Sequence, residues 1–159
     1  MLRQMLVPVD FSACAHQVAQ HAFDLARAIG GQVTLLHVPE DQDVEKARTL
    51  LRQLSALARQ PPECLVVPVQ TLLPGGVGAV ILEVATRQRA ELIVLGLPGP
   101  LCPGAGHRGQ VACAVLLGAC IPVQMVPCRP PNPATLSGWR AVVEQECPVR
   151  HGLGAVTRR

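Results

Sequence analysis

The stretch QMLVPVD, residues 4–10, is a near-continuous apolar run that ends in a carboxylate. A strand with one face in water alternates apolar and polar residues, whereas a strand covered on both faces does not. The run therefore predicts a strand inside a parallel sheet. Asp10 is expected at the carboxyl end of that strand.

Four further runs have the same character. They are QVTLLHV (32–38), CLVVPVQ (64–70), AELIVLG (90–96) and IPVQMVP (121–127). Pro68 predicts that the run at 64–70 is an edge strand, because proline has no N–H to donate to a ladder.

Between these runs, apolar residues recur at helical spacing. The predicted helices cover residues 15–29, 44–60, the stretch from the glycines at 75–78 to about Arg89, and 110–118. This alternation predicts an α/β fold, a single doubly wound five-stranded parallel sheet with helices on both faces. In such sheets ligands bind outside the carboxyl ends of the strands, where the strand order reverses.

Length and charge suggest one domain followed by a tail. Residues 1–127 contain nine Lys/Arg and nine Asp/Glu, whereas residues 128–159 contain five Arg and two Glu. We predict a domain at 1–127 and a Pro-rich linker with a basic C-terminal tail at 128–159. A neutral body with 2% aromatic residues is not typical of a nucleic-acid-binding protein.

Neither a membrane span nor an export signal is evident. The longest weakly polar run, residues 111–123, has 13 residues and is too short for a bilayer core of about 30 Å. The first ten residues lack the apolar region of a signal peptide and include an acid. We therefore expect no membrane partner and a cytoplasmic location.

The seven cysteines are odd in number, widely scattered and without a C-x-x-C pair. This pattern predicts neither a disulfide framework nor a metal site, and most of the cysteines are expected to be small buried residues. Catalytic motifs are likewise missing from the sequence, so we do not expect an enzyme. His37, inside a predicted strand, is expected to be a hydrogen-bonded core or crevice residue rather than a catalyst.

The stretch GLPGPLCPGAGHRGQ, residues 96–110, follows the fourth predicted strand. Its literal G-x-G-x-x-G at 104–109 does not fit a dinucleotide fingerprint, because it lies well past the strand and no acid follows at 120–130. Gly96, Gly99 and Gly109 give a different spacing, G-x2-G-x9-G. Glycines let a ligand approach the backbone closely, and free N–H groups at a helix start favour anions. Gly109, Gln110 and Val111 are expected to supply such donors.

Taken together, these motifs resemble the universal stress protein family over about residues 3–127. The similar segments are MLVPVDFS (5–12), VTLLHV (33–38), AVILEVA (79–85), AELIVLG (90–96) and GQVACAVLLGACIPVQMVP (109–127). The resemblance implies an adenine nucleotide alpha hydrolase-like fold with strand order 3-2-1-4-5. It also implies a homodimer in which residues Val123 to Val126 pair antiparallel with a second copy.

The resemblance further implies an adenine nucleotide site for ATP, with Mg. Asp10 would contact the nucleoside, Val38 would meet the adenine through its backbone, and the glycines would approach the ribose and phosphates. On the matching positions, the site residues would be Pro8, Val9, Asp10, Val38, Leu95, Gly96, Gly99, Gly109, Gln110 and Val111.

This chain departs from the family pattern at two positions. Gln110 replaces the Ser or Thr that follows the last glycine, and Pro100 replaces a basic or polar residue. We therefore keep two hypotheses. One is a stress-response regulatory protein that binds nucleotide, with an unidentified partner; the other is a nucleotide-free interaction module of the same fold. Asp10 also has an alternative role, capping the following helix together with Ser12.

Overall fold

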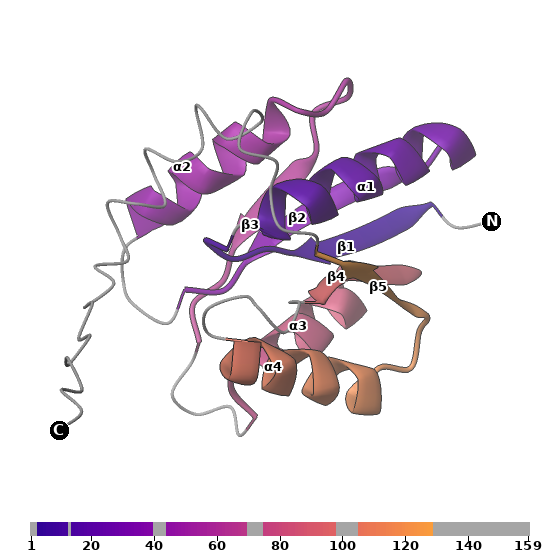
Figure 1. Ribbon diagram of the computed structural model, residues 1–159. Helices are drawn as coiled ribbons and strands as arrows, with labels where there is room; N and C mark the ends of the chain where they lie inside the picture. Colours follow the sequence, from indigo (N-terminus) through magenta and orange to yellow (C-terminus); the bar gives the residue numbers. More distant parts are fainter. Residues whose placement is uncertain (1–2, 13, 40–43, 70–74, 98–104, 129–159) are drawn as a thin grey trace, which may run out of the picture.

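The computed structural model describes residues 3–128, apart from 13, 40–43, 70–74 and 98–104; residues 129–159 lie outside it. Five parallel strands form one sheet in the order β3-β2-β1-β4-β5 (Figure 1). The predicted fold class and strand order are confirmed. The strands are β1 (Gln4–Pro8), β2 (Gln32–His37), β3 (Glu63–Val66), β4 (Leu92–Leu97) and β5 (Val123–Pro127).

Four helices cover the two faces of the sheet. The helices are α1 (Cys14–Ile29), α2 (Val44–Ser55), α3 (Gly76–Arg87) and α4 (Ala105–Gly118). In Figure 1, α1 and α2 lie on one face, and α3 and α4 lie on the other. Within the described ranges, none of these helices is long and apolar enough to span a membrane.

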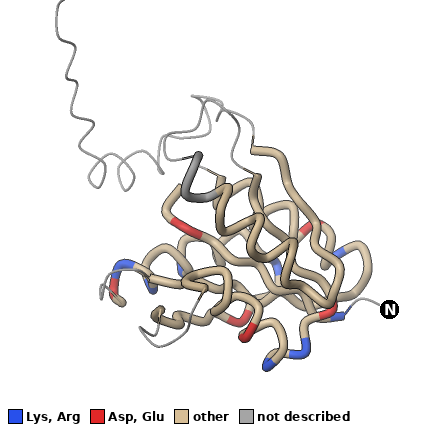
Figure 2. The backbone as a smooth tube through the Cα atoms, turned by 90° about the horizontal axis from the view of Figure 1, so that it is seen from below, with Lys and Arg blue, Asp and Glu red and all other residues tan. Residues whose placement is uncertain are grey.

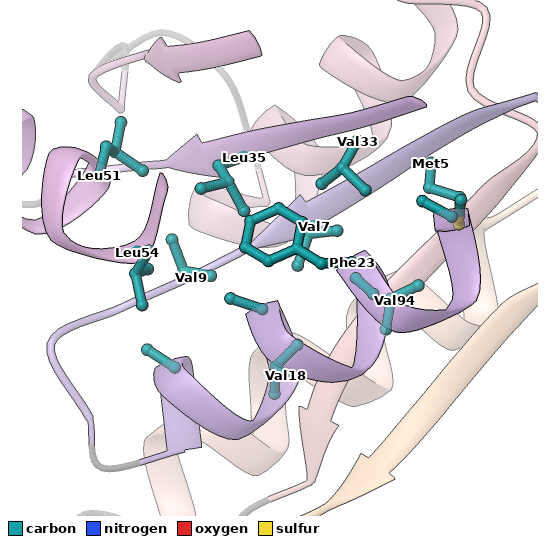
Figure 3. Close-up of a cluster of buried hydrophobic side chains, with 14 of the residues drawn as sticks. Met5, Val7, Val9, Val18, Phe23, Val33, Leu35, Leu51, Leu54 and Val94 are labelled. Atoms are coloured by element: carbon teal, nitrogen blue, oxygen red, sulfur yellow. The ribbon is translucent and has the colours of Figure 1, made fainter. Parts of the chain in front are cut away.

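The sheet separates two hydrophobic cores. Met5, Val7 and Val9 pack with α1 and α2, as Figure 3 shows for that face. Leu6 belongs to the opposite core with residues of α3 and α4, and both Leu6 and Val7 are 0% exposed. Successive residues of β1 thus serve different cores, which explains why the sequence at 4–10 lacks a polar alternation.

Helix α2 ends at Ser55, five residues before the predicted end at residue 60. The Ser55 hydroxyl donates to Leu51 O at 2.6 Å, and tighter turns follow, with Leu57 N–H bonded to Leu54 O at 3.1 Å. A serine that bonds back to the helix in this way competes with continued helical hydrogen bonding. The predicted edge position of the third strand is confirmed, although Pro68 lies beyond the end of β3.

Acidic and basic positions are interspersed along the described backbone (Figure 2). Three exposed pairs lie within single helices, namely Arg27–Asp24, Arg48–Glu45 and Arg87–Glu83. Pairs of this kind contribute little to stability, about 0.3–0.5 kcal/mol each. The fold therefore depends on its two cores and on the sheet rather than on surface ion pairs.

A carboxylate fastens the amino end of β1. Glu91 Oε2 accepts hydrogen bonds from the backbone N–H groups of Arg3 and Gln4. The Glu91 N–H in turn donates to Gln4 O at 2.8 Å. The backbone N–H donors of Arg3 and then Gln4 hold the pKa of Glu91 below its usual value.

The substitution Glu91→Gln tests this contact, because it removes the charge and keeps the shape. A carboxyl group whose pKa is lowered in the folded state stabilises the fold above its unfolded-state pKa, and this contribution is lost as the pH falls through the folded-state pKa. We expect the variant to unfold at lower urea concentration than the wild type at neutral pH. At pH values below the folded-state pKa the two midpoints should converge; a difference that persists in acid would contradict the electrostatic explanation.

Candidate functional site

The strand order reverses between β1 and β4. From β1 the chain runs outward through β2 to β3, and it then returns to place β4 and β5 on the other side of β1. The β1–β2 ladder reaches Pro8↔Leu36, whereas the described β1–β4 ladder ends at Leu6↔Ile93. Such a reversal is where open α/β sheets bind ligands, at the carboxyl ends of the strands.

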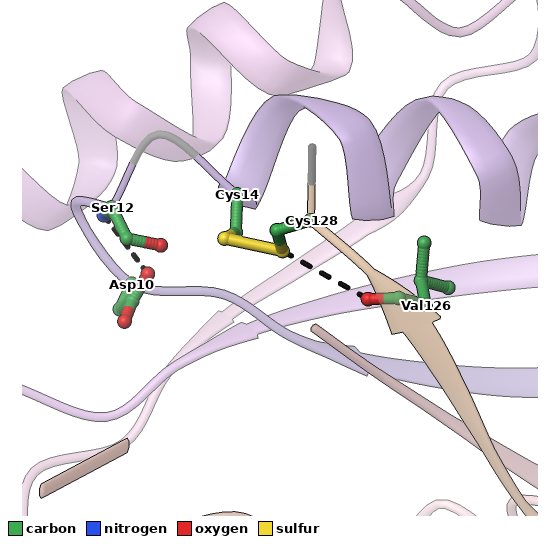
Figure 4. Close-up of a disulfide and its surroundings, with 5 residues drawn as sticks. All are labelled: Asp10, Ser12, Cys14, Val126 and Cys128. Atoms are coloured by element: carbon green, nitrogen blue, oxygen red, sulfur yellow. Dashed lines mark hydrogen bonds between the residues drawn. A yellow bond between two sulfur atoms is a disulfide. The ribbon is translucent and has the colours of Figure 1, made fainter. Parts of the chain in front are cut away.

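Asp10 lies at this edge, just past the end of β1, and is half-buried. Its Oδ1 accepts the N–H of Ser12 at 2.9 Å (Figure 4). The Ser12 carbonyl then accepts the N–H of Ala15 in the first turn of α1 at 3.1 Å. The carboxylate of Asp10 therefore shapes the turn that leads into α1.

Both backbone polar groups of Val9 bond to residues of β2. Its N–H donates to Leu36 O at 2.8 Å, and its carbonyl lies 2.8 Å from His37 Nδ1. Because a carbonyl only accepts, Nδ1 carries the proton. His37 is 5% exposed and its ring meets Phe11 edge-on, with centroids 5.0 Å apart. The prediction of a hydrogen-bonded core histidine is confirmed, and this histidine fixes the backbone just before Asp10.

Most of the predicted apolar site residues are part of the two cores. Val9 is 7%, Val38 9% and Leu95 5% exposed. Val9 packs on the α1 side, and Val38 and Leu95 pack on the α3 side, while Pro8 is half-buried. Any contact of Val38 or Leu95 with a ligand would therefore be made chiefly through the backbone.

Gly96 has a packing role that the sequence did not reveal. A Cβ placed on it would lie 2.9 Å from Val18 Cγ2 and 3.5 Å from both Cys128 Sγ and Cys14 Cβ. The space that its missing side chain leaves is therefore already filled by α1 and the cysteines. This packing is enough to explain why position 96 is a glycine, without the predicted approach of a ligand.

Helix α4 begins at Ala105, five residues before the predicted start at Gln110. The first four N–H groups of a helix lack partners within it, so these donors belong to residues 105–108. The expectation that Gly109, Gln110 and Val111 supply free N–H groups at the helix start is wrong. A Cβ on Gly109 would meet no atom of the described residues within 4 Å, as is also true at Gly30 and Gly76.

The other residues of this region differ in exposure. Gln110 is exposed, and Val111 is half-buried and packs against the core beneath α3 and α4. Gly99 lies outside the described residues. The structure thus brings Asp10, Gly96 and Val9 to one edge of the sheet and assigns Gly96 a packing contact.

The expectation of no disulfide is wrong. Cys14 and Cys128 are joined, with their Cα atoms 5.3 Å apart and a sequence separation of 114 (Figure 4). Cys128, which we assigned to the tail, also donates its N–H to Leu97 O at 3.0 Å. Cys14 follows β1 and Cys128 follows β5, and parallel strands end at the same edge of a sheet. The pairing could therefore be expected from the strand order but not from the spacing of the cysteines in sequence.

The prediction that most cysteines are buried is wrong for three of the described ones. Cys64, Cys113 and Cys120 are free and exposed.

A separate groove of about 340 Å³ lies between α2 and the edge strand β3. Two strands, β2 and β1, separate β3 from β4, so this groove is not part of the site at the β1–β4 reversal. Among the described residues there is no group of three or more His, Cys, Asp or Glu residues that could hold a metal ion. The lining residues of the groove are Val44, Arg48, Leu51, Arg52, Cys64 and Val66.

Comparison with known proteins agrees with this geometry. A model of the universal stress protein family matches residues 1–127. A universal stress protein from Archaeoglobus fulgidus in complex with dAMP is 25% identical, with a TM-score of 0.59 over 79% of this chain and 98% of that chain.

Two further structures show the same fold. A universal stress protein in complex with cAMP is 19% identical, with a TM-score of 0.61 over 79% of this chain and 97% of that chain. Universal stress protein UspA from Lactobacillus plantarum is 22% identical, with a TM-score of 0.65 over the same shares of the two chains. A comparison with curated protein sequences gave no significant match.

The two glycines at the site should respond oppositely to alanine. Gly96→Ala forces a methyl group against Val18, and overpacking of this kind costs about 1–3 kcal/mol of the free energy of unfolding. Gly109→Ala places a methyl group in open space within a helix, where alanine is favoured over glycine by about 0.5–1 kcal/mol. Urea unfolding of both variants measures this difference, and equal destabilisation of the two would contradict these packing assignments.

Proposed function

Because the chain belongs to the universal stress protein family, we propose that it is a stress-response regulatory protein that binds an adenine nucleotide at the carboxyl ends of β1 and β4. ATP, with Mg, is the proposed ligand. The dAMP complex of the Archaeoglobus fulgidus relative supports the choice of an adenine nucleotide. The single observation that carries the proposal is the reversal of strand order between β1 and β4, which places Asp10 at the edge where such sheets bind ligands.

The amino end of α4 suits an anion. The helix begins at Ala105, directly after the loop from the carboxyl end of β4, and its first turn contains no acidic residue. The unpaired N–H groups at a helix start carry partial positive charge and favour phosphate. The backbone N–H groups of residues 105–108 would therefore hold the phosphates, and Gly109 would leave room for them.

Asp10 is suited to the nucleoside end of the ligand. One of its oxygens accepts the Ser12 N–H, and a carboxylate offers about four acceptor positions in total. Hydroxyl and amine donors of a nucleoside can occupy positions that the turn does not use. His37 and Phe11, which fix the backbone around Asp10, would keep this carboxylate in place.

The alternative of a nucleotide-free interaction module draws support from two observations. The glycine at position 96 is explained by packing, and Gln110 stands where the family carries a hydroxyl. Under this alternative the fold would act through its exposed edges. Thermal unfolding separates the two hypotheses, because only a ligand that binds the folded state raises its midpoint.

The fifth strand is the proposed dimer interface. Ile93 N–H donates to Pro122 O and Cys128 N–H donates to Leu97 O, both at 3.0 Å. Backbone groups alternate in direction along a strand, so Gln124 and Val126 face β4, whereas the N–H groups of Val123 and Met125 face away. A second copy pairing antiparallel along Val123 to Val126 would satisfy these groups and cover a sheet edge.

An exposed apolar side chain lies beside this edge strand. Leu97, at the end of β4, is 44% exposed, and its register partner in β5 is Pro127. Covering Leu97 on association would remove apolar surface from water, which supports the proposed dimer.

Calorimetric titration with ATP and Mg tests nucleotide binding. A methyl group at Gly109 would occupy the proposed phosphate space, so Gly109→Ala should weaken binding about tenfold or more while raising the stability of the free protein. Gln110→Ser restores a hydroxyl beside this glycine and should tighten binding. Absence of heat and of thermal stabilisation at millimolar ATP would refute the proposal and favour the nucleotide-free module.

A pair of variants at Met125 tests the dimer. Met125→Ala and Met125→Pro both remove the side chain, but only proline removes the N–H that faces away from β4. We expect Met125→Ala to remain a dimer and Met125→Pro to become a monomer by light scattering, with the tail retained in both. A dimeric proline variant would show that the subunits associate elsewhere.

A further inference from the structure

The Cys14–Cys128 disulfide lies next to the proposed nucleotide site. Cys14 begins α1, immediately after the turn that Asp10 and Ser12 form (Figure 4). Both cysteines contact the side-chain position of Gly96, at 3.5 Å from Cys14 Cβ and from Cys128 Sγ. The disulfide thus joins the start of α1 to the residue after β5 and packs against β4 at Gly96.

The two sulfur atoms differ in their surroundings. Cys14 is 6% exposed, whereas Cys128 is half-buried. An attacking thiolate therefore reaches Cys128 more readily. Cys14 lies at the amino end of a 16-residue helix whose first turn has no acidic residue. A helix start stabilises a thiolate, so Cys14 is the better leaving group.

We propose that Cys14 and Cys128 form a thiol–disulfide exchange site for small thiols and that its oxidation state sets the affinity of the adjacent nucleotide site. The second part rests on the proposed function. The reductant is a low-molecular-weight thiol, and the oxidant is the corresponding small-molecule disulfide.

The exchange balances in two steps. The thiolate of the small thiol attacks Cys128 Sγ, the bond between the protein sulfurs breaks, and its electron pair goes to Cys14, which takes up a proton. A second small thiol then attacks the mixed disulfide at the small-molecule sulfur, and Cys128 leaves as a thiolate and is protonated. Two small thiols become one small disulfide, and two electrons and two protons reach the protein.

The fold provides hydrogen-bond partners for Cys128 after the disulfide is reduced. Cys128 Sγ lies 3.8 Å from Val126 O, which would accept the hydrogen of the free thiol. The Cys128 N–H remains available to Leu97 O. Reduction therefore opens the covalent link without leaving the Cys128 sulfur unpartnered.

Opening the link affects the turn that carries Asp10. In the oxidised protein, the start of α1 is tied to the segment after β5 beside Gly96, which restricts the turn that Asp10 and Ser12 form before the helix. A site that is ordered before its ligand arrives loses less entropy on binding. We therefore expect the oxidised protein to bind ATP more tightly than the reduced protein, by severalfold.

The experiment uses the 159-residue chain with five cysteines replaced by serine, namely Cys64, Cys102, Cys113, Cys120 and Cys147. Equilibration with mixtures of reduced and oxidised glutathione, followed by acid quenching and intact-mass measurement, should show a reversible change of two hydrogen masses. Peptide mapping should assign it to Cys14 and Cys128. A pair that stays reduced, or stays oxidised, in every mixture would overturn the exchange site.

ATP titration of the two end states of this variant tests the coupling. We expect tighter binding in the oxidised state, and the further change Cys128→Ser should give the reduced-state affinity under both conditions. Equal affinity in the two states would refute the coupling. Absence of ATP binding in both states, together with reversible exchange, would refute the proposed function and the coupling but leave the exchange site supported.

Discussion

The burial of β1 on both faces is the constraint on which the other features depend. Met5, Leu6 and Val7 are at most 1% exposed, so each side of this strand must be covered by helices. Ladders to β2 and β4 complete its hydrogen bonding. Strand β1 lies between β2 and β4, and the chain continues outward from these two strands on opposite sides of the sheet. The strand order therefore reverses at β1, and Asp10 lies at this reversal. The same arrangement thus accounts for the two cores and for the location of the candidate site.

The sequence predicted this architecture well because apolar periodicity reports burial directly. Continuous runs identified the strands, and the predicted end of the first helix at residue 29 is the observed end of α1. The start of α4 was not predictable in this way, because glycines at 106 and 109 weaken local helix preference. Docking against α3 contributes instead, as shown by a Cβ on Gly78 that would come within 2.8 Å of Ala114 Cβ.

The candidate site was less predictable because the type of residue at a position does not reveal why that type is needed there. A glycine that makes room for a ligand and one that makes room for a valine look alike in sequence, and Gly96 is of the second kind. His37 was easier, since a histidine inside an apolar strand needs a partner and found one in Val9 O. The cysteine pair became visible only when the strand order placed the residues after β1 and β5 at the same edge.

The disulfide also changes how the chain transmits mechanical force. Residues 14 and 128 are neighbours through a covalent bond although their sequence separation is 114. Tension applied between the amino terminus and the segment after Cys128 therefore passes from β1 to the sulfur atoms and bypasses everything between. Such a pull would load β1 along its own axis while strands β2 to β5 and helices α1 to α4 stayed outside the load path. The central strand would thus bear the load in the oxidised protein.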